Sequence, residues 1–272
     1  MVTLTARADI EQALADPNLV PLPAPDGGTE GSMAWFRATV ARFAHGEAHA
    51  RRRAHVEAEL ARIDADGLRR LAAGAVGETD AVGETGAVGA VGAVGDDRIR
   101  VLRALAHGMD LPQLDAAALH ALLIVAANYF GGAGLDEDTD PAADAAVRLL
   151  LPLMQTPDVE LDPEQAANRI GILIQACDAT ATLIAAARAS GDLHATLRTD
   201  PPVRVMRRTA LAATRVGDTE IAAGDLMLLE VGPLGLTFGH GPRVCPGRAL
   251  ALALAEGALE SAEGVQEPEE RA

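Results

Sequence analysis

The segment Leu236-Thr-Phe-Gly-His-Gly-Pro-Arg-Val-Cys-Pro-Gly-Arg-Ala-Leu250 is the most informative stretch of the chain. It surrounds a single cysteine, Cys245, with three glycines, so the backbone can turn tightly about the sulfur. The sequence after Pro246-Gly247 predicts a helix to about Leu259, whose first N–H groups would point back at the sulfur and favour the thiolate. Arg243 is a nearby cation of the kind that also lowers a thiol pKa. Such a thiolate suits a nucleophile or a metal ligand; a buried structural cysteine is the alternative.

Length, composition and charge limit the remaining possibilities. The chain has 272 residues, of which 49% are hydrophobic, enough for one large or two small domains with a sizeable core. Aromatic residues are only 2%, and the many alanines favour helices. The formal net charge of −16 argues against a nucleic-acid partner, which would need a basic surface, and against docking on an anionic membrane.

The chain carries no pattern typical of a membrane span or a leader. Its apolar runs are interrupted before they reach the roughly 20 residues that a span needs. The N-terminal stretch MVTLTARADIEQAL lacks the apolar core of a signal peptide. Two cysteines, Cys177 and Cys245, are too few for a disulfide scaffold. These features predict a cytoplasmic, reducing location.

Helix caps and breakers predict a mainly α chain with a small β part. Ser32 is expected to cap a helix that carries Trp35, Val40 and Phe43 and is interrupted at Gly46. Asp162-Pro163 is expected to begin a long helix that ends at Gly191. Other helices are expected over residues 9–16, 47–71, 97–107, 115–130 and 140–151. Short strands are expected within residues 203–231, with turns at 217–218 and 224–225.

Two segments are expected to lie outside regular structure. In the tract 75–95 the triplet Ala-Val-Gly recurs, and its glycines disfavour a helix by up to about 1 kcal/mol each. It is interpreted as a flexible low-complexity insert. The acidic tail from residue 260 is expected to be frayed. The whole chain, 1–272, is interpreted as a single domain.

The Cys245 segment resembles the heme-binding loop of the cytochrome P-450 family, Phe-x-x-Gly-x-Arg/His-x-Cys-x-Gly. All five fixed positions are matched, by Phe238, Gly241, Arg243, Cys245 and Gly247, and Gly239 lies in the same cofactor-binding loop. The resemblance implies that Cys245 is the axial thiolate of a heme b iron, a ligand that favours O–O cleavage. It also implies that Arg243 pairs with a heme propionate.

Weaker resemblances to the family occur upstream, in the expected order. Phe43–Arg53 resembles its His-x-x-x-Arg element, with His49 and Arg53 on one face of a helix. Both would reach heme propionates, although a solvated basic helix face is the alternative. Arg208 resembles another arginine of the family that binds a propionate.

The stretch Gln175–Ile184 resembles the family's distal helix, which carries an acid followed by a threonine. Asp178 matches the acid, whereas Ala179 occupies the place of the proton-delivering threonine. Thr180 follows one residue later, about 100° around the helix. Asp178, Ala179 and Thr180 are the catalytic candidates. Cys177 is expected to be a small buried residue.

Other departures bear on oxygen activation more than on heme ligation. Arg198 matches the arginine of the family's Glu-x-x-Arg pair, but Ala195 replaces the glutamate. The loop between Val231 and Leu236 is nearly absent, and family members are considerably longer. Without the threonine, proton delivery, which contributes roughly 100- to 10,000-fold, needs another route.

The sequence thus predicts a shortened cytochrome P-450-like fold and a heme-thiolate monooxygenase. Its substrate would be a small organic molecule, of the kind made in secondary metabolism, and its electron donor a ferredoxin-type protein. Two alternatives remain. One is a heme-free auxiliary protein that assists a biosynthetic partner enzyme. The other is a heme protein with non-oxygenase chemistry, such as dehydration or cyclisation.

Overall fold

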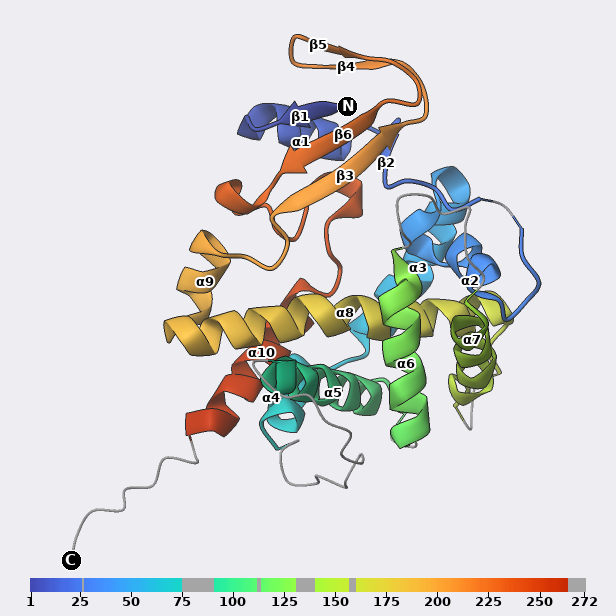
Figure 1. The fold of residues 1–272 in the computed structure, drawn as a ribbon, viewed down its shortest axis with the longest axis vertical. Helices are drawn as coiled ribbons and strands as arrows, with labels where there is room; N and C mark the ends of the chain where they lie inside the picture. The colour runs from blue at the N-terminus through green and yellow to red at the C-terminus, as the bar shows by residue number, and fades with distance from the viewer. Residues whose placement is uncertain (26, 75–90, 112–113, 131–139, 157–159, 264–272) are drawn as a thin grey trace, which may run out of the picture.

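The computed structural model describes residues 1–25, 27–74, 91–111, 114–130, 140–156 and 160–263. A large group of helices lies below a small sheet in Figure 1. The helices are α1 (Arg7–Ala15), α2 (Met33–Thr39), α3 (Gly46–Ala61), α4 (Ala65–Gly74), α5 (Val91–Gly108), α6 (Ala116–Tyr129), α7 (Pro141–Leu153), α8 (Pro163–Ser190), α9 (Leu193–Thr199) and α10 (Arg248–Glu263). The 3-10 helices are η1 (Ala41–Phe43), η2 (Gly232–Leu234) and η3 (Gly241–Arg243). The mainly helical fold class with a small β part is confirmed.

The long helix α8 crosses the middle of the molecule and packs against α5, α9 and α10 (Figure 1). Its bounds agree with the prediction because both ends are capped. The Asp162 carboxylate accepts a hydrogen bond from the Gln165 N–H at 2.8 Å, and the Gln165 side chain accepts one from the Asp162 N–H, a complete capping box. Gly191 ends the helix in the left-handed conformation, with φ of 75°.

Helices α4, α5, α8 and α10 form one packed group. A buried carboxylate of α5, Asp97, accepts a hydrogen bond at 2.8 Å from the Arg188 guanidinium of α8. Gly257 of α10 meets α4 so closely that an added Cβ would clash with the Arg69 carbonyl oxygen. The helix α10, which follows Cys245, is therefore attached to the helical core.

The sheet has the strand order β1-β6-β3-β2. Its strands are β1 (Val2–Leu4), β2 (Leu19–Val20), β3 (Val205–Ala210) and β6 (Leu226–Glu230). β1 runs parallel to β6, and the other pairs are antiparallel. β4 (Thr214–Val216) and β5 (Thr219–Ile221) form a hairpin that turns at Gly217, as predicted.

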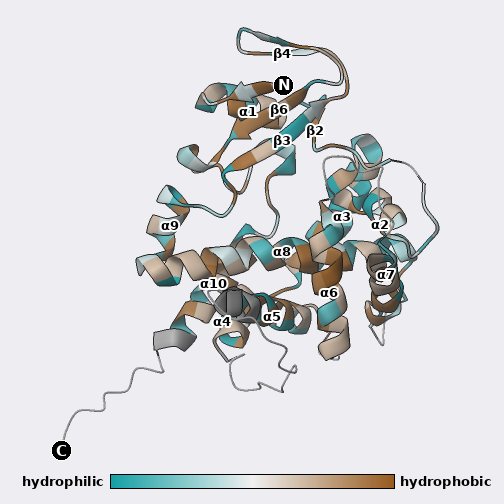
Figure 2. Ribbon diagram, viewed as in Figure 1, coloured by the Kyte–Doolittle hydropathy of each residue, from teal (hydrophilic) through white to brown (hydrophobic). Residues whose placement is uncertain are grey.

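Two buried apolar clusters hold these parts together. The larger one joins the helices α2 to α8 and α10, and the smaller one lies between α1 and the sheet. Apolar residues concentrate along α6 and β6 in Figure 2. Ser32 caps α2 as predicted, because its Oγ accepts a hydrogen bond from the Trp35 N–H at 3.1 Å. The prediction that this helix continues through Val40 and Phe43 is wrong: α2 ends at Thr39, Val40 is extended, and the Ala41 N–H donates to the Asn168 side chain of α8 at 2.9 Å.

The helix predicted over 47–71 is divided in the structure. α3 ends at Ala61, the Ile63 side chain turns into the core with 8% exposed, and α4 begins at Ala65. Asp64 makes the break possible, because its carboxylate accepts hydrogen bonds from the Asp66 and Gly67 N–H groups. The local cap and the burial of Ile63 outweigh the continuous helical pattern.

The glycine-rich tract also differs from the prediction at its C-terminal end. Residues 75–90 lie outside the described residues, but α5 already begins at Val91 rather than at Asp97. The structure therefore extends α5 across glycines that by themselves disfavour a helix. At the other end of the chain, α10 extends to Glu263, beyond the predicted end at Leu259, and residues 264–272 are not described.

One helix, α8, is long and apolar enough by composition to cross a membrane. Most of its apolar stretch, 61%, is buried inside the protein. Its residues belong to the main hydrophobic cluster, so α8 is a core helix of this fold.

Candidate functional site

The Cys245 loop is tightly folded by its glycines. Gly239 and Gly241 adopt φ values of 79° and 66°, the left-handed region that favours glycine. The Cys245 N–H donates to the Phe238 carbonyl oxygen at 2.7 Å, closing the loop. The Gly247 N–H donates to the Cys245 sulfur. The prediction that N–H groups at the start of the last helix point back at the sulfur is confirmed for Gly247.

The predicted direction of the Cys245 pKa is wrong for the protein alone. Burial raises the pKa of the Cys245 thiol, and the Gly247 N–H, Arg53 and Arg248 offset only part of that effect. The cations beside the sulfur are thus Arg53 and Arg248, not Arg243, whose Nη2 instead donates to the Ala44 carbonyl at 2.7 Å. A bound metal ion would release the proton, since a coordinating thiol is deprotonated outright.

Elements distant in sequence support the loop. An added Cβ at Gly241 would lie 3.1 Å from the Ala15 Cα of α1, so the loop and α1 are in close contact. The Arg248 guanidinium lies over the Phe238 ring, 5.3 Å from its centroid. Arg53 of α3 donates to the Val244 carbonyl oxygen at 2.7 Å. The sulfur is therefore presented by a preformed loop.

The other predicted cofactor-binding residues form one cationic cluster near this loop. Burial, followed by the nearby charges of Arg243 and Arg53, lowers the pKa of His49 to about 4. Burial, Arg42 and Arg243 lower the pKa of Arg208 to about 10. Burial, Arg42 and Arg53 lower the pKa of Arg243 to about 10 as well. Arg208 and Arg243 thus lie among like charges, the arrangement expected of a site for an anion.

Two guanidinium groups of the cluster are buried without complete hydrogen bonding. Arg208 on β3 has 5% of its surface exposed, and its Nε has no partner. The Nε of Arg42 on η1 is also buried and unpartnered. Buried donors in proteins nearly always have acceptors. The cluster therefore fits a ligand that brings carboxylates, as the two propionates of heme do.

Arg42 was not among the residues found from the sequence. It stands alone in an apolar stretch, outside the His-x-x-x-Arg element, and no motif marks it. Its guanidinium lies over the Phe130 ring, 5.0 Å from the centroid. Only the folded chain brings it to the cluster, where it lowers the pKa of Arg208 and Arg243.

Comparisons by sequence find no relative: no protein-family model and no curated protein matches the chain. Solved structures do match. P450BioI, in complex with an acyl carrier protein ligated to hexadec-9Z-enoic acid, superposes with a TM-score of 0.66 at 13% identity, over 96% of this chain and 84% of that one. The fold is that of the cytochromes P450.

Two further P450 structures agree. CxnD, a cytochrome P450 enzyme for C–S bond formation in chuangxinmycin biosynthesis, gives a TM-score of 0.64 at 16% identity, over 95% of this chain and 78% of that one. CYP164A2 of Mycobacterium smegmatis gives 0.60 at 19% identity, over 97% and 84%. The chain is thus a divergent, shortened version of the P450 fold.

The middle of α8 corresponds to the predicted distal helix. Asp178 forms an ion pair with Arg98 of α5 at 2.8 Å, and both side chains are 41% exposed. Thr180 is only 3% exposed, so its hydroxyl points into the helix packing. Thr182 is exposed and lies within about 60° of Ala179 around the helix. Thr182 therefore presents an exposed hydroxyl on the face of α8 that carries Ala179. The family motif does not mark this position, so the sequence analysis did not consider it.

Two other sequence observations concern residues near α8. Cys177 is fully buried in the helix, and burial raises the pKa of its thiol to about 12, so it is the inert core residue expected. Ala195 lies in α9, where its N–H donates to the Asp192 cap at 2.8 Å. The Arg198 side chain has no hydrogen bond or ion pair among the described residues.

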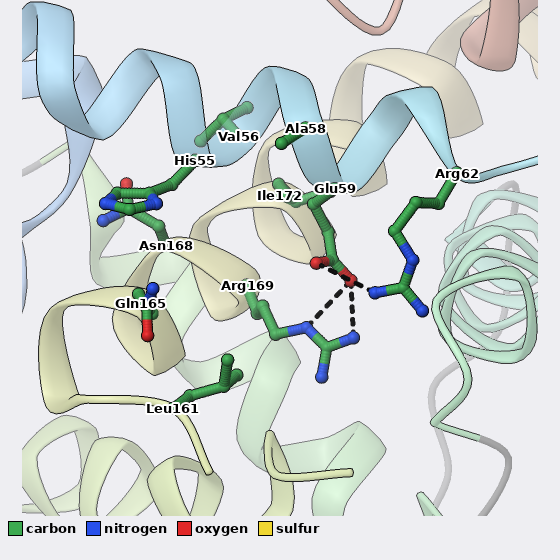
Figure 3. Close-up of a pocket in the computed structure, with 10 residues that line it drawn as sticks. All are labelled: His55, Val56, Ala58, Glu59, Arg62, Leu161, Gln165, Asn168, Arg169 and Ile172. Atoms are coloured by element: carbon green, nitrogen blue, oxygen red, sulfur yellow. Dashed lines mark hydrogen bonds and ion pairs between the residues drawn. The ribbon is translucent and has the colours of Figure 1, made fainter. Parts of the chain in front are cut away.

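A cavity of about 230 Å³ opens between α3 and the N-terminal part of α8, away from the motif residues (Figure 3). Its charged groups are already paired. Arg169 donates to Glu59 at 2.9 Å, and also to the Met109 carbonyl oxygen at 2.8 Å. This arrangement is that of a structural ion pair joining α3 to α8.

Proposed function

We propose that the chain is a heme-thiolate protein in which Cys245 ligates the iron of heme b. The observation that carries the proposal is the combination of a preformed Cys245 loop with the nearby Arg208, whose buried guanidinium group is incompletely bonded. His49, Arg53, Arg208 and Arg243 would hold the two propionates, with Phe238, Gly239, Gly241 and Gly247 shaping the loop. A heme held in this way would supply iron chemistry in which electron density donated by the thiolate favours O–O cleavage.

The proposed reaction is the oxidation of a small organic molecule, of the kind made in secondary metabolism, by a monooxygenase. Asp178 would support proton delivery together with the exposed hydroxyl of Thr182, because Ala179 has no hydroxyl and Thr180 is buried. Asp178 would have to deliver protons while it also forms an ion pair with Arg98. The electron donor would be a ferredoxin-type protein.

We further propose a cytoplasmic location and a single domain over residues 1–272. Both cysteines are free thiols, which suits a reducing compartment. In the described part of the chain, the helix that resembles a membrane span, α8, is mostly buried. Neither a nucleic acid nor a membrane is part of the proposal, in keeping with the net charge of −16.

The decisive experiment is an absorption spectrum of the ferrous–carbon monoxide form of protein expressed with ample heme. We expect the strongly red-shifted Soret band of thiolate ligation in the wild type. We expect the band to be absent in Cys245→Ala and unchanged in Cys177→Ala, the matched control for a buried thiol. The same band in Cys245→Ala would refute the proposed ligand. Protein without heme would favour the auxiliary, heme-free function.

A heme protein with non-oxygenase chemistry is a second candidate. It is favoured by Ala179, which provides no hydroxyl, and by Asp178, which is engaged with Arg98. Product formation with peroxide, or with a reductase and ferredoxin, would support the oxygenase. Conversion of a substrate without any oxidant would support the second candidate.

A further inference from the structure

Resting on the proposed heme-thiolate function, we infer that the substrate carries a carboxylate, and that Arg42 and Tyr129 recognise it. The two side chains meet within an aromatic group at the C-terminal end of α6. This site is distinct from the residues assigned to the heme propionates. The inference rests on the packing of this group, on its unpartnered donors and on the charge of the whole cluster.

Arg42 reaches the end of α6 through contacts with aromatic rings. Its guanidinium carbon lies 5.0 Å from the Phe130 ring centroid. The Phe130 ring packs edge-on against Tyr129, with centroids 5.1 Å apart, and Tyr129 lies 5.1 Å from Phe43. Arg42 and Tyr129 therefore belong to one aromatic group, which suits a ligand with an apolar body and a charged end.

Both side chains present a buried donor without an acceptor. The Tyr129 side chain is 1% exposed, and its hydroxyl has no hydrogen-bond partner. The Nε of Arg42 is buried and unpartnered as well. Burial raises the pKa of Tyr129 well above its usual value, so the hydroxyl stays protonated and can donate. Two donors of the same aromatic group that both lack an acceptor fit a carboxylate, which can accept from both.

The charge of the cluster leaves room for one more anion. Arg42, Arg53, Arg208 and Arg243 are cations, and Glu57 pairs with Arg53 at 2.6 Å. Glu57 is the only carboxylate paired with these arginines in the described part of the chain. Two propionates would offset two of the remaining three charges. One positive charge would then stay buried, which is costly without a partner.

The size of the excess favours a carboxylate over a phosphate. A carboxylate carries a single charge, whereas a phosphate monoester carries nearly two at neutral pH. His49 adds no charge at neutral pH, because its pKa is lowered to about 4. Arg37 is a separate case: it donates to the Tyr129 carbonyl oxygen at 3.3 Å, where the negative end of α6 offsets its charge.

The test compares phenylalkanoates of several chain lengths with the matching phenylalkanols, which differ in charge but little in shape. Binding to heme-loaded protein is followed by the shift of the Soret band and by calorimetry. We expect the wild type to prefer the acids by roughly 10- to 100-fold, the range for hydrogen bonds to a charged group. Arg42→Gln should lose most of this preference and Tyr129→Phe part of it. Arg215→Gln, on the exposed β4–β5 hairpin, should keep it.

Heme content is measured for every variant, so the two proposals fail in different ways. Wild-type protein that binds no heme would overturn both. Heme-loaded wild type that shows no preference for the acid at any chain length would overturn only the carboxylate site. An unchanged preference in Arg42→Gln would do the same. Loss of heme from Arg42→Gln would assign Arg42 to a propionate instead, and would also overturn the inference.

Discussion

The Cys245 loop and the middle of α8, the two segments that carry the candidate site, are held in place very differently. The loop is closed by its own backbone hydrogen bond and is in contact with α1 and α3. The middle of α8 is held by the packing of its buried face, and its exposed Asp178 makes a half-exposed ion pair with Arg98. The position of Cys245 is thus fixed by the fold, whereas the proposed chemistry on the α8 side depends on exposed side chains, those of Asp178 and Thr182, that can change without disturbing the packing.

The largest effect is expected where α8 is anchored, at its N-terminal part. Arg169 is 5% exposed as a side chain and pairs with Glu59. Arg169→Met should lower the free energy of unfolding by about 3–5 kcal/mol, because Glu59 and two backbone carbonyls lose their partner. Urea unfolding measures the change. Arg215→Met, on the exposed hairpin, is the control and should change stability by less than about 0.5 kcal/mol.

A smaller effect is expected from filling the contact between the loop and α1. Gly241→Ala should cost about 2–3 kcal/mol in heme-free protein, since it combines a positive φ with a Cβ 3.1 Å from the Ala15 Cα. Gly224→Ala has a similar φ of 85° but no atom within 4 Å, and should cost about 1 kcal/mol. Equal losses in urea unfolding would mean that α1 does not support the loop.

Removing an unsatisfied donor should stabilise the protein. Tyr129→Phe deletes a buried hydroxyl that has no partner, and should raise the free energy of unfolding of ligand-free protein by about 1 kcal/mol. Thermal unfolding without ligand measures the gain. A loss of stability would show that the hydroxyl has an acceptor within the protein.

A pH effect of similar size is expected from His49. Its pKa is about 4 in the folded protein, below the ordinary value of about 6.5. The unfolded chain therefore binds a proton more readily between these values, so stability is complete above about pH 6.5 and falls as the pH drops toward 4. Because His49 is partly exposed, we expect a loss of about 1 kcal/mol. Urea unfolding across this range, compared with His49→Gln, isolates the contribution; identical pH profiles would contradict it.

The smallest effect is expected in the middle of α8. Asp178→Asn breaks an ion pair whose side chains are both 41% exposed, and should cost less than about 1 kcal/mol. Chemical unfolding is measured at low salt and at roughly 0.5 M salt, which strongly screens exposed charges. A loss as large as that of Arg169→Met would mean that the middle of α8 is as firmly held as its end.

Local signals explain which parts of the fold were predictable. The capping box at Asp162 and the glycine at position 191 fix α8 at both ends, so the sequence alone predicted its bounds. The break between α3 and α4 depends on the burial of Ile63, a contact with the rest of the core that a helical pattern does not contain. The early start of α5 was likewise not predictable, because the glycines at positions 92 and 95 locally disfavour a helix.

The candidate site divides in the same way. The Cys245 loop was predictable because a cysteine among glycines and a following helix are local features. The rise in the Cys245 pKa was not, because burial comes from the rest of the molecule. Arg42 was missed for the same reason: its role depends on Phe130 and Tyr129, which are far away in the sequence.

The pairing of β1 with β6 has a consequence for how the protein is made. Val2 lies beside Met227, so the first strand leaves the ribosome long before its neighbour exists. The helical core can assemble during translation, whereas the sheet must wait for almost the whole chain, and such distant pairing is slow. Because α1 follows β1 directly and contacts the Cys245 loop, we expect the cysteine to reach its final position only after β1 has paired with β6. Cofactor capture would then be among the last steps of maturation.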